Sequence, residues 1–94
     1  MTFAWDPEKD RLNQRKHGIS FESAMRVFED PTAVSYIDRV VDGEERWHTI
    51  GPIAGIPIVL VVHTIEEEHG EEEIRIISAR KASPRERALY DAYQ

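Results

Sequence analysis

The sequence predicts an α+β fold with two N-terminal helices, a four-stranded antiparallel sheet and a C-terminal helix. Its helix-capping signals lie near the two ends of the chain, whereas alternating or continuous apolar segments fill the middle. The turns between these apolar segments are short, which is typical of antiparallel hairpins. Helices that are grouped, instead of alternating with strands, indicate helices packed on an antiparallel sheet.

Three segments carry helix signals. Asp6–Lys16 begins with an N-cap residue and a proline, and it ends in cationic residues followed by glycine. Ser20–Glu29 begins with a serine cap, and its apolar residues at positions 21, 24, 25 and 28 form one face of a helix. Ser83–Tyr93 opens with Ser83 and Glu86 at capping-box spacing.

Four strands are expected between the helices, in the segments Ala33–Asp38, Arg46–Ile53, Ile56–Ile65 and Glu73–Arg80. The third segment is apolar on both faces, so we expect it to be the central, buried strand of the sheet. Six glutamates occupy residues 66–73, and this segment is predicted to be an acidic loop.

The composition is that of a globular protein, and 94 residues leave room for one domain, predicted to span residues 1–94. No apolar run approaches the ~20 residues of a membrane span. The N-terminus lacks a signal-peptide pattern, so a cytoplasmic location is expected. The absence of cysteine excludes disulfides, thiolate nucleophiles and cysteine-based zinc sites.

The net charge of −6, taken as an average, argues against a nucleic-acid-binding protein. The charges are unevenly distributed, however. From Arg75 to Arg87 the only acidic residue is Glu86, and a second cationic group lies near the N-terminus. These two basic segments could converge to hold a phosphate backbone; the alternative is that each run is an ordinary solvated surface.

Several segments resemble the BrnT family of toxins, in order and over almost the whole chain. They are FAWDP (residues 3–7) with Lys9 and Asn13, KHGISFE (16–22), DGEER (42–46) followed by Ile50 and Gly51, VVHT (61–64), IRIISAR (74–80), and Glu86, Arg87 and Tyr90. The combination is far more specific than any one segment. Two features depart from the family pattern: the glutamate-rich segment, and His48 and His69, which inherit no role.

The resemblance implies a fold similar to that of RelE-type ribonuclease toxins and cleavage of RNA without a metal or other cofactor. It also implies a protein partner, a BrnA-type antitoxin encoded by an adjacent gene. That antitoxin would carry a DNA-binding module, so DNA would be bound only indirectly, through a complex that represses its own operon. No membrane partner is expected.

RNA cleavage of this kind requires the 2′-hydroxyl to attack the adjacent phosphorus, with a base, an acid and cations that stabilise the added negative charge. Arginine suits the last role because its planar guanidinium grips phosphate at two points. Arg80 and Arg75 are the first candidates, followed by Lys16 and Arg46. Arg80 is preferred to Arg75, because it ends its strand beside the N-terminus of the last predicted helix, whose free N–H groups could also bind an anion. Because 75 and 80 differ by an odd number, strand alternation places them on opposite faces unless a twist or bulge redirects Arg80.

Each of these candidates has a structural alternative. For Arg75 and Arg80 it is a surface salt bridge to the glutamate-rich segment. His17 and His63 are candidate acids or bases, because histidine titrates near neutral pH. A helix C-terminus explains His17 equally well, and a hydrogen-bonded core position explains His63. Glu45 is a candidate base or an ion-pair partner of its neighbour.

Five further side chains are expected to bind RNA: Arg11, Arg15, Lys81, Arg85 and Tyr90. The tyrosine would stack on a base or simply pack in the core. Two other functions stay open. A metal enzyme using histidine and glutamate ligands is disfavoured, because no His-Glu-x-x-His spacing occurs. A non-catalytic protein- or nucleic-acid-binding module of a two-gene regulatory complex agrees better with the acidic net charge.

Overall fold

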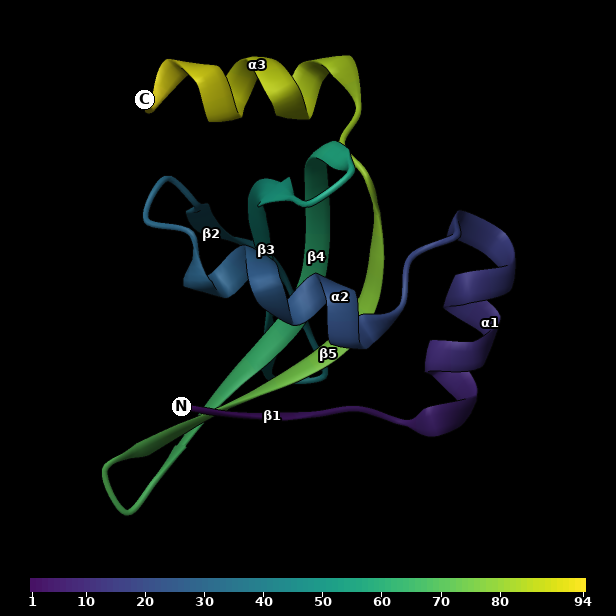
Figure 1. Ribbon diagram of the computed structural model, residues 1–94. Coiled ribbons are helices and arrows are strands. Elements are labelled where there is room, and N and C mark those ends of the chain that lie inside the picture. The colour runs from purple at the N-terminus through teal and green to yellow at the C-terminus, as the bar shows by residue number, and fades with distance from the viewer.

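The computed structural model describes all 94 residues and contains a five-stranded mixed sheet with helices on both faces (Figure 1). The elements in chain order are β1 (Thr2–Ala4), α1 (Pro7–His17), α2 (Phe21–Ala24), the 3₁₀ helix η1 (Met25–Glu29), β2 (Val34–Val41), β3 (Glu44–Ile53), β4 (Ile56–Glu68), β5 (Glu71–Lys81) and α3 (Pro84–Ala92). The α+β class is confirmed. None of the α-helices is long and apolar enough to cross a membrane.

The predicted four-stranded antiparallel sheet was wrong by one strand. The additional strand is β1, which pairs in parallel with β5 and gives the order β1-β5-β4-β3-β2. Three residues are too few to show an alternating pattern, so this strand depends on the edge that β5 offers. The prediction for β4 is confirmed: it lies at the centre, with Val59, Leu60 and Val61 fully buried.

Helix α1 is held in place by polar contacts instead of an apolar face. Asp6 caps its start by accepting a hydrogen bond from the Glu8 N–H at 2.8 Å, and Gly18, with φ 72°, ends it. The Asn13 side chain hydrogen-bonds the backbone of Ala79 on β5 twice, accepting from the N–H at 3.1 Å and donating to the carbonyl at 2.8 Å. These contacts place α1 beside β5, and the predicted boundaries are correct to within one residue.

The predicted second helix is in fact two short helices. Ser20 caps α2 as expected, since its Oγ accepts a hydrogen bond from the Ser23 N–H at 3.0 Å. From Met25 the backbone tightens into η1, which brings Val27 onto the sheet. A Cβ atom at Gly51 would lie 3.1 Å from Val27 Cγ1, so glycine is what permits this close approach.

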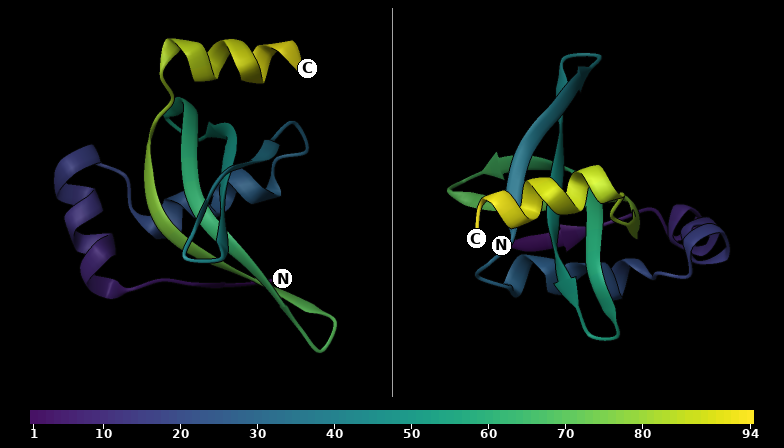
Figure 2. Two further views of the ribbon diagram at one scale, coloured as in Figure 1. Left: turned by 180° about the vertical axis from the view of Figure 1, so that it is seen from behind. Right: turned by 90° about the horizontal axis from the view of Figure 1, so that it is seen from above.

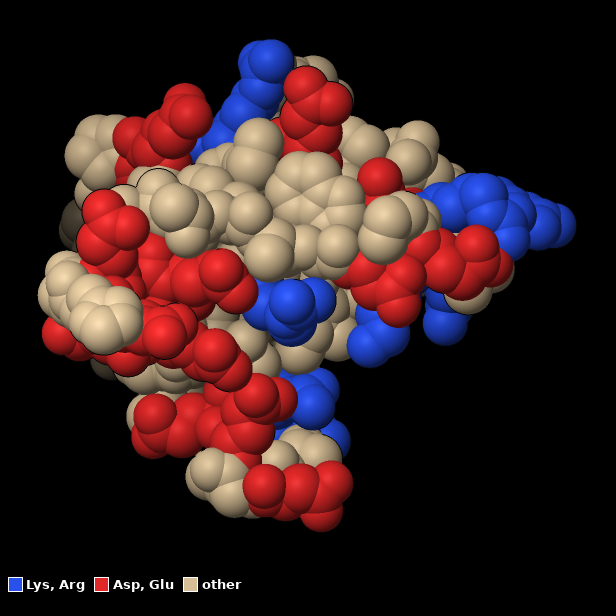
Figure 3. All heavy atoms as spheres, turned by 90° about the horizontal axis from the view of Figure 1, so that it is seen from below, with Lys and Arg blue, Asp and Glu red and all other residues tan.

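Residues 66–73 are not a loop, because β4 and β5 continue through them as a hairpin. The turn at His69 and Gly70 has φ of 54° and 82°, and positive φ at both positions is what a two-residue hairpin turn of type I′ requires. Three pairs of glutamates lie directly opposite each other across the two strands: 66 and 73, 67 and 72, and 68 and 71. The hairpin projects from the body (Figure 1), and acidic side chains gather on the same side of the view from below (Figure 3).

Two hydrophobic cores lie on opposite faces of the sheet. The larger, which includes Phe21, Val27 and Val61, lies under α2 and η1. The smaller, built from Ile50, Leu60 and Tyr90, lies under α3. Helix α3 crosses only one end of its face, where β5 finishes (Figures 1 and 2), and no other helix covers that face.

Candidate active site

A β-bulge in β5 changes which side chains share a face of the sheet. The register between β4 and β5 shifts between Val62 and His63, which leaves Ile77 as the extra residue of β5. An extra residue reverses the alternation of the side chains that follow it. Arg75 precedes the bulge and Arg80 follows it, so the two arginines lie on the same face.

The cross-strand partners confirm this placement. Thr64 lies opposite Arg75, and Leu60 lies opposite Arg80. Thr64, Val62 and Leu60 alternate along β4 and therefore point to one side, which is the side of α3. Regular alternation would have placed the two arginines on opposite faces, but the bulge that the sequence analysis allowed for is present and brings them onto one face. We call the part of this face beyond α3, marked by Thr64 and Arg75, the open sheet face.

Arg46 on β3 extends the cationic group. Trp47 pairs with His63, and continuing that register by one residue carries Arg46 toward Thr64. Arg46 Nε lies 3.4 Å from Glu44 Oε1 but makes no hydrogen bond, and this nitrogen and Thr64 Oγ1 are the two buried side-chain polar atoms without a partner. Buried polar atoms nearly always have a partner, so these two atoms are exceptions in this fold.

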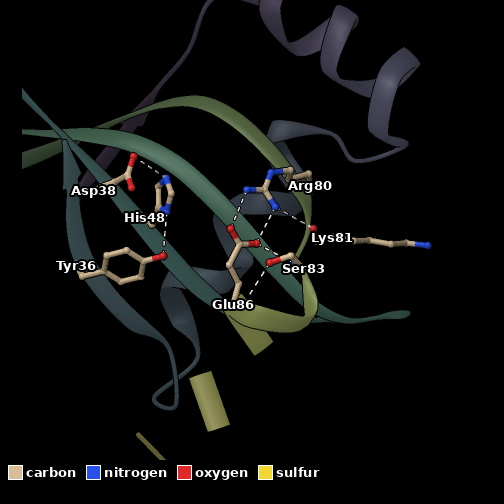
Figure 4. A network of polar contacts seen from close by, with 7 residues as sticks. All are labelled: Tyr36, Asp38, His48, Arg80, Lys81, Ser83 and Glu86. Carbon is tan, nitrogen blue, oxygen red and sulfur yellow. Dashed lines mark hydrogen bonds and ion pairs between the residues drawn. The ribbon is translucent and has the colours of Figure 1, made fainter. Parts of the chain in front are cut away.

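Arg80 is held by Glu86 of α3 in a two-point ion pair (Figure 4). The distances are 2.7 Å from Nη1 to Oε1 and 2.8 Å from Nη2 to Oε2. The same carboxylate accepts the Ser83 N–H at 2.8 Å, while Ser83 Oγ accepts the Glu86 N–H, so the predicted capping box is confirmed. The hydrogen bonds from Arg80 are the main reason that the pKa of Glu86 falls to about 2.

The two arginines of β5 therefore differ in what they can bind. The salt bridge considered for Arg80 exists, but with Glu86 and not with the glutamate-rich segment. That carboxylate also occupies the N-terminus of α3, which sequence reasoning offered as an anion site. Arg75 is exposed and makes no ion pair. Of the two, Arg75 has the free guanidinium.

A second polar group, which sequence reasoning missed, faces Arg80 and Glu86 (Figure 4). The Tyr36 hydroxyl lies 3.0 Å from His48 Nδ1, and His48 Nε2 lies 3.5 Å from Asp38 Oδ2. Burial is the main cause of two pKa shifts here: it lowers the pKa of His48 and raises that of Tyr36.

The strands explain how this group forms. Tyr36 on β2 pairs directly with His48 on β3. Asp38 is the extra residue of a bulge in β2, between Ile37 and Arg39, and bulges redirect side chains. Alternation along β3 places His48 on the same face as Arg46, and this could have been predicted from the sequence. No local pattern reveals the bulge at Asp38. These three side chains line a cleft of about 520 Å³, whose other wall is α3.

Several predicted catalytic residues lie away from the open sheet face. His63 is on the opposite face and 1% exposed, with Nε2 2.7 Å from Thr49 Oγ1, and burial lowers its pKa to about 4. These observations favour the structural alternative, in which His63 is a hydrogen-bonded residue of the core. His17 and Lys16 lie at the end of α1, beyond the edge of β5 (Figure 1). Glu45 is exposed, and alternation along β3 directs it away from the face of its neighbour Arg46.

The residues predicted to bind RNA are also dispersed. Arg11 and Arg15 are exposed on α1, where Arg11 pairs with a glutamate of its own helix. Lys81 points away from the network (Figure 4), whereas Arg85 lines the cleft. Tyr90 is 8% exposed and its hydroxyl bonds a threonine 2.6 Å away, so it packs in the core instead of offering a stacking surface. No group of three or more histidine, aspartate or glutamate side chains is placed to hold a metal ion.

The comparisons with known proteins agree with the segments that resemble BrnT. A search of the curated proteins finds no match. The model of the family described as the ribonuclease toxin BrnT of a type II toxin–antitoxin system matches residues 5–86. That stretch contains the open sheet face, the Arg80–Glu86 pair and the Tyr36–His48–Asp38 group. The chain belongs to the BrnT family of ribonuclease toxins of type II toxin–antitoxin systems.

Proposed function

We propose that this toxin is a RelE-like, metal-independent endoribonuclease that binds and cleaves RNA on the open sheet face. Family membership supports RNA as the substrate. The observation that carries the location is the β5 bulge, which puts Arg75 and Arg80 on one face beside the unpartnered Thr64 hydroxyl and Arg46 Nε. Arginines that share one face of a sheet suit a phosphate whose negative charge grows during reaction.

The proposed reaction is attack by the 2′-hydroxyl on the adjacent phosphorus. The new bond joins the 2′-oxygen to phosphorus and the bond to the 5′-oxygen breaks, leaving a 2′,3′-cyclic phosphate and a 5′-hydroxyl. Arg75 is the proposed main phosphate contact because its guanidinium is free, with Arg46 beside it. Arg80, held by Glu86, borders the site. Sequence reasoning favoured Arg80 over Arg75, and the ion pair reverses that order.

The proposed partner is a BrnA-type antitoxin that covers the open sheet face and keeps the toxin inactive in the cytoplasm. The toxin family implies a protein antitoxin. The net charge of −6 makes unaided binding of any phosphate backbone weak at physiological salt. We therefore assign contact with DNA to the antitoxin alone. A non-catalytic binding module remains the second candidate, because this acidic charge favours it.

Expression of the chain alone, compared with co-expression of the neighbouring small reading frame, tests this proposal. We expect growth arrest in the first case, relief in the second, and copurification of the two proteins. RNA incubated with the purified chain and EDTA should show new 5′-hydroxyl ends. A chain that is harmless when expressed alone and leaves RNA intact would be a binding module. Cleavage abolished by EDTA would overturn the metal-independent mechanism.

A further inference from the structure

We propose that Tyr36, His48 and Asp38 form a proton relay for RNA cleavage, in which the Tyr36 hydroxyl takes the proton of the attacking 2′-hydroxyl. This inference rests on the proposed function and adds to it a base drawn from β2 and β3. None of the three was a candidate from sequence, and the histidine and glutamate candidates considered there lie on other surfaces.

The geometry sets the order of the relay. Asp38 Oδ2 lies 3.5 Å from His48 Nε2, which favours the tautomer with the proton on that nitrogen. His48 Nδ1 is then an acceptor, and it receives the Tyr36 O–H at 3.0 Å. A phenol oxygen that donates its own proton keeps lone pairs to accept another. These lone pairs belong to a residue that lines the cleft.

The surroundings keep His48 ready to accept a proton. Its side chain is 13% exposed, and burial lowers its pKa below the ordinary 6.5, so it is neutral at pH 7. The charged and titratable groups that face it are Tyr36, Asp38 and Arg39 from β2, Arg80 from β5, and Arg85 and Glu86 from α3. Asp38 and Glu86 favour its protonated form, while Arg80 and Arg39 oppose it. Asp38 is therefore placed to stabilise the imidazolium once it forms.

The reaction needs no reactant other than RNA and water. As the 2′-oxygen bonds to phosphorus, its proton passes to the Tyr36 oxygen, and the tyrosine's own proton passes to His48 Nδ1. The bond from phosphorus to the 5′-oxygen breaks, and that oxygen takes a proton from water. His48 returns its proton to solvent through Tyr36 before the next turnover. Tyr36 is the catalytic residue, and His48 and Asp38 act through it.

The relay also borders the proposed phosphate contacts. The cleft that Tyr36, His48 and Asp38 line is closed on its other side by Arg85 and Glu86 of α3. Glu86 holds Arg80, and Figure 4 shows this pair opposite the Tyr36 hydroxyl. We therefore place the ribose of a phosphate that lies beside Arg80 toward β2 and β3.

The test is single-turnover RNA cleavage, measured from pH 5 to 9, by the parent chain, Tyr36→Phe and His48→Gln. His69→Gln, at the hairpin tip, is the matched control. Loss of a general base typically costs ~10²–10⁴ in rate, so we expect at least a ~100-fold loss in both relay variants and none in the control. The parent rate should rise with pH through a value below 6.5, and this rise should be absent in His48→Gln. A further variant, His48→Ala, leaves space for free imidazole. Added imidazole should restore part of the cleavage rate of His48→Ala but not that of Tyr36→Phe.

Tyr36→Phe removes only the hydroxyl and keeps the aromatic ring. This variant therefore tests the relay even if a histidine variant fails to fold. Parental rates in Tyr36→Phe would overturn the relay, as would an unchanged pH profile in His48→Gln. If Arg75→Ala is inactive in the same assay, the proposed function survives that outcome. A parent chain that cleaves no RNA would overturn both.

Discussion

Replacing Arg80 by alanine should destabilise the fold, because Arg80 is one half of a two-point ion pair that also fixes the start of α3. In the parent, the Glu86 carboxylate accepts hydrogen bonds from both Nη atoms of Arg80 and from the Ser83 N–H. Arg80→Ala leaves this largely buried carboxylate, 17% exposed, with the Ser83 N–H alone. The charge then lies in a place that water reaches poorly.

The size of the effect follows from the exposure of the two partners. A hydrogen bond to a charged group contributes ~1.5–3 kcal/mol, whereas an exposed ion pair contributes ~0–1 kcal/mol. The Arg80 side chain is 37% exposed, so solvent screens its side of the pair and the estimate must be reduced. We expect Arg80→Ala to lower the free energy of unfolding by about 2 kcal/mol, which for a chain of this size lowers the Tm by about 8–16 °C.

The loss should depend on pH in a defined direction. The pKa of Glu86 is about 2 in the folded chain, below its ordinary 4.5. A lowered carboxyl pKa stabilises the fold fully above the ordinary value, and this stabilisation is lost as pH falls through the folded value. The difference in unfolding free energy between the parent and Arg80→Ala should therefore be constant above pH 4.5 and shrink toward pH 2.

Urea titrations at pH 7, 4 and 3 measure this difference. Arg87→Ala, an exposed arginine of α3 without an ion pair, is the control and should match the parent. In a double-mutant cycle with Glu86→Gln, the two losses should not add. Equal stability of Arg80→Ala and the parent at pH 7 would refute the reasoning, as would a difference that persists unchanged at pH 3.

Three further changes test other parts of the fold. Stability should rise between pH 4 and 6.5, by up to ~1.4 kcal/mol per pH unit, because unfolded His63 binds a proton that the buried side chain does not; His63→Asn should flatten this rise in urea titrations. Asn13→Ala should cost ~1–3 kcal/mol by leaving the Ala79 backbone unpaired, and a urea midpoint equal to the parent's would contradict this. Glu67→Lys, opposite Glu72, should stabilise the hairpin by ~0.2–1 kcal/mol, so its amides should exchange more slowly at low salt; faster exchange would oppose the account.

Features determined within a few residues of the chain could be predicted from the sequence. The caps at Asp6, Ser20 and Ser83 are local, and each lies where the residue pattern placed it. The central position of β4 follows from its apolar character on both faces. The end of α2 was missed because η1 continues the same apolar pattern, while the close approach of Val27 to Gly51 depends on a distant strand.

Features that depend on distant parts of the chain could not be predicted. Strand β1 exists through its pairing with β5, and the glutamates of residues 66–73 are extended because the hairpin below them is already paired. The bulges at Asp38 and Ile77 have no sequence signature, yet each redirects a side chain of the site. Residue type therefore identified the arginines of the candidate site, while their grouping and the role of His48 required the register of the sheet.

The central claim is that the open sheet face cleaves RNA, and the most direct test is the single-turnover rate of Arg75→Ala in the presence of EDTA. Loss of one contact to a developing oxyanion typically costs ~10²–10³ in rate. We expect a loss of that size with an unchanged melting temperature, because Arg75 is exposed and unpaired, and no loss in Arg87→Ala. A folded Arg75→Ala chain that cleaves RNA at the parental rate would contradict it.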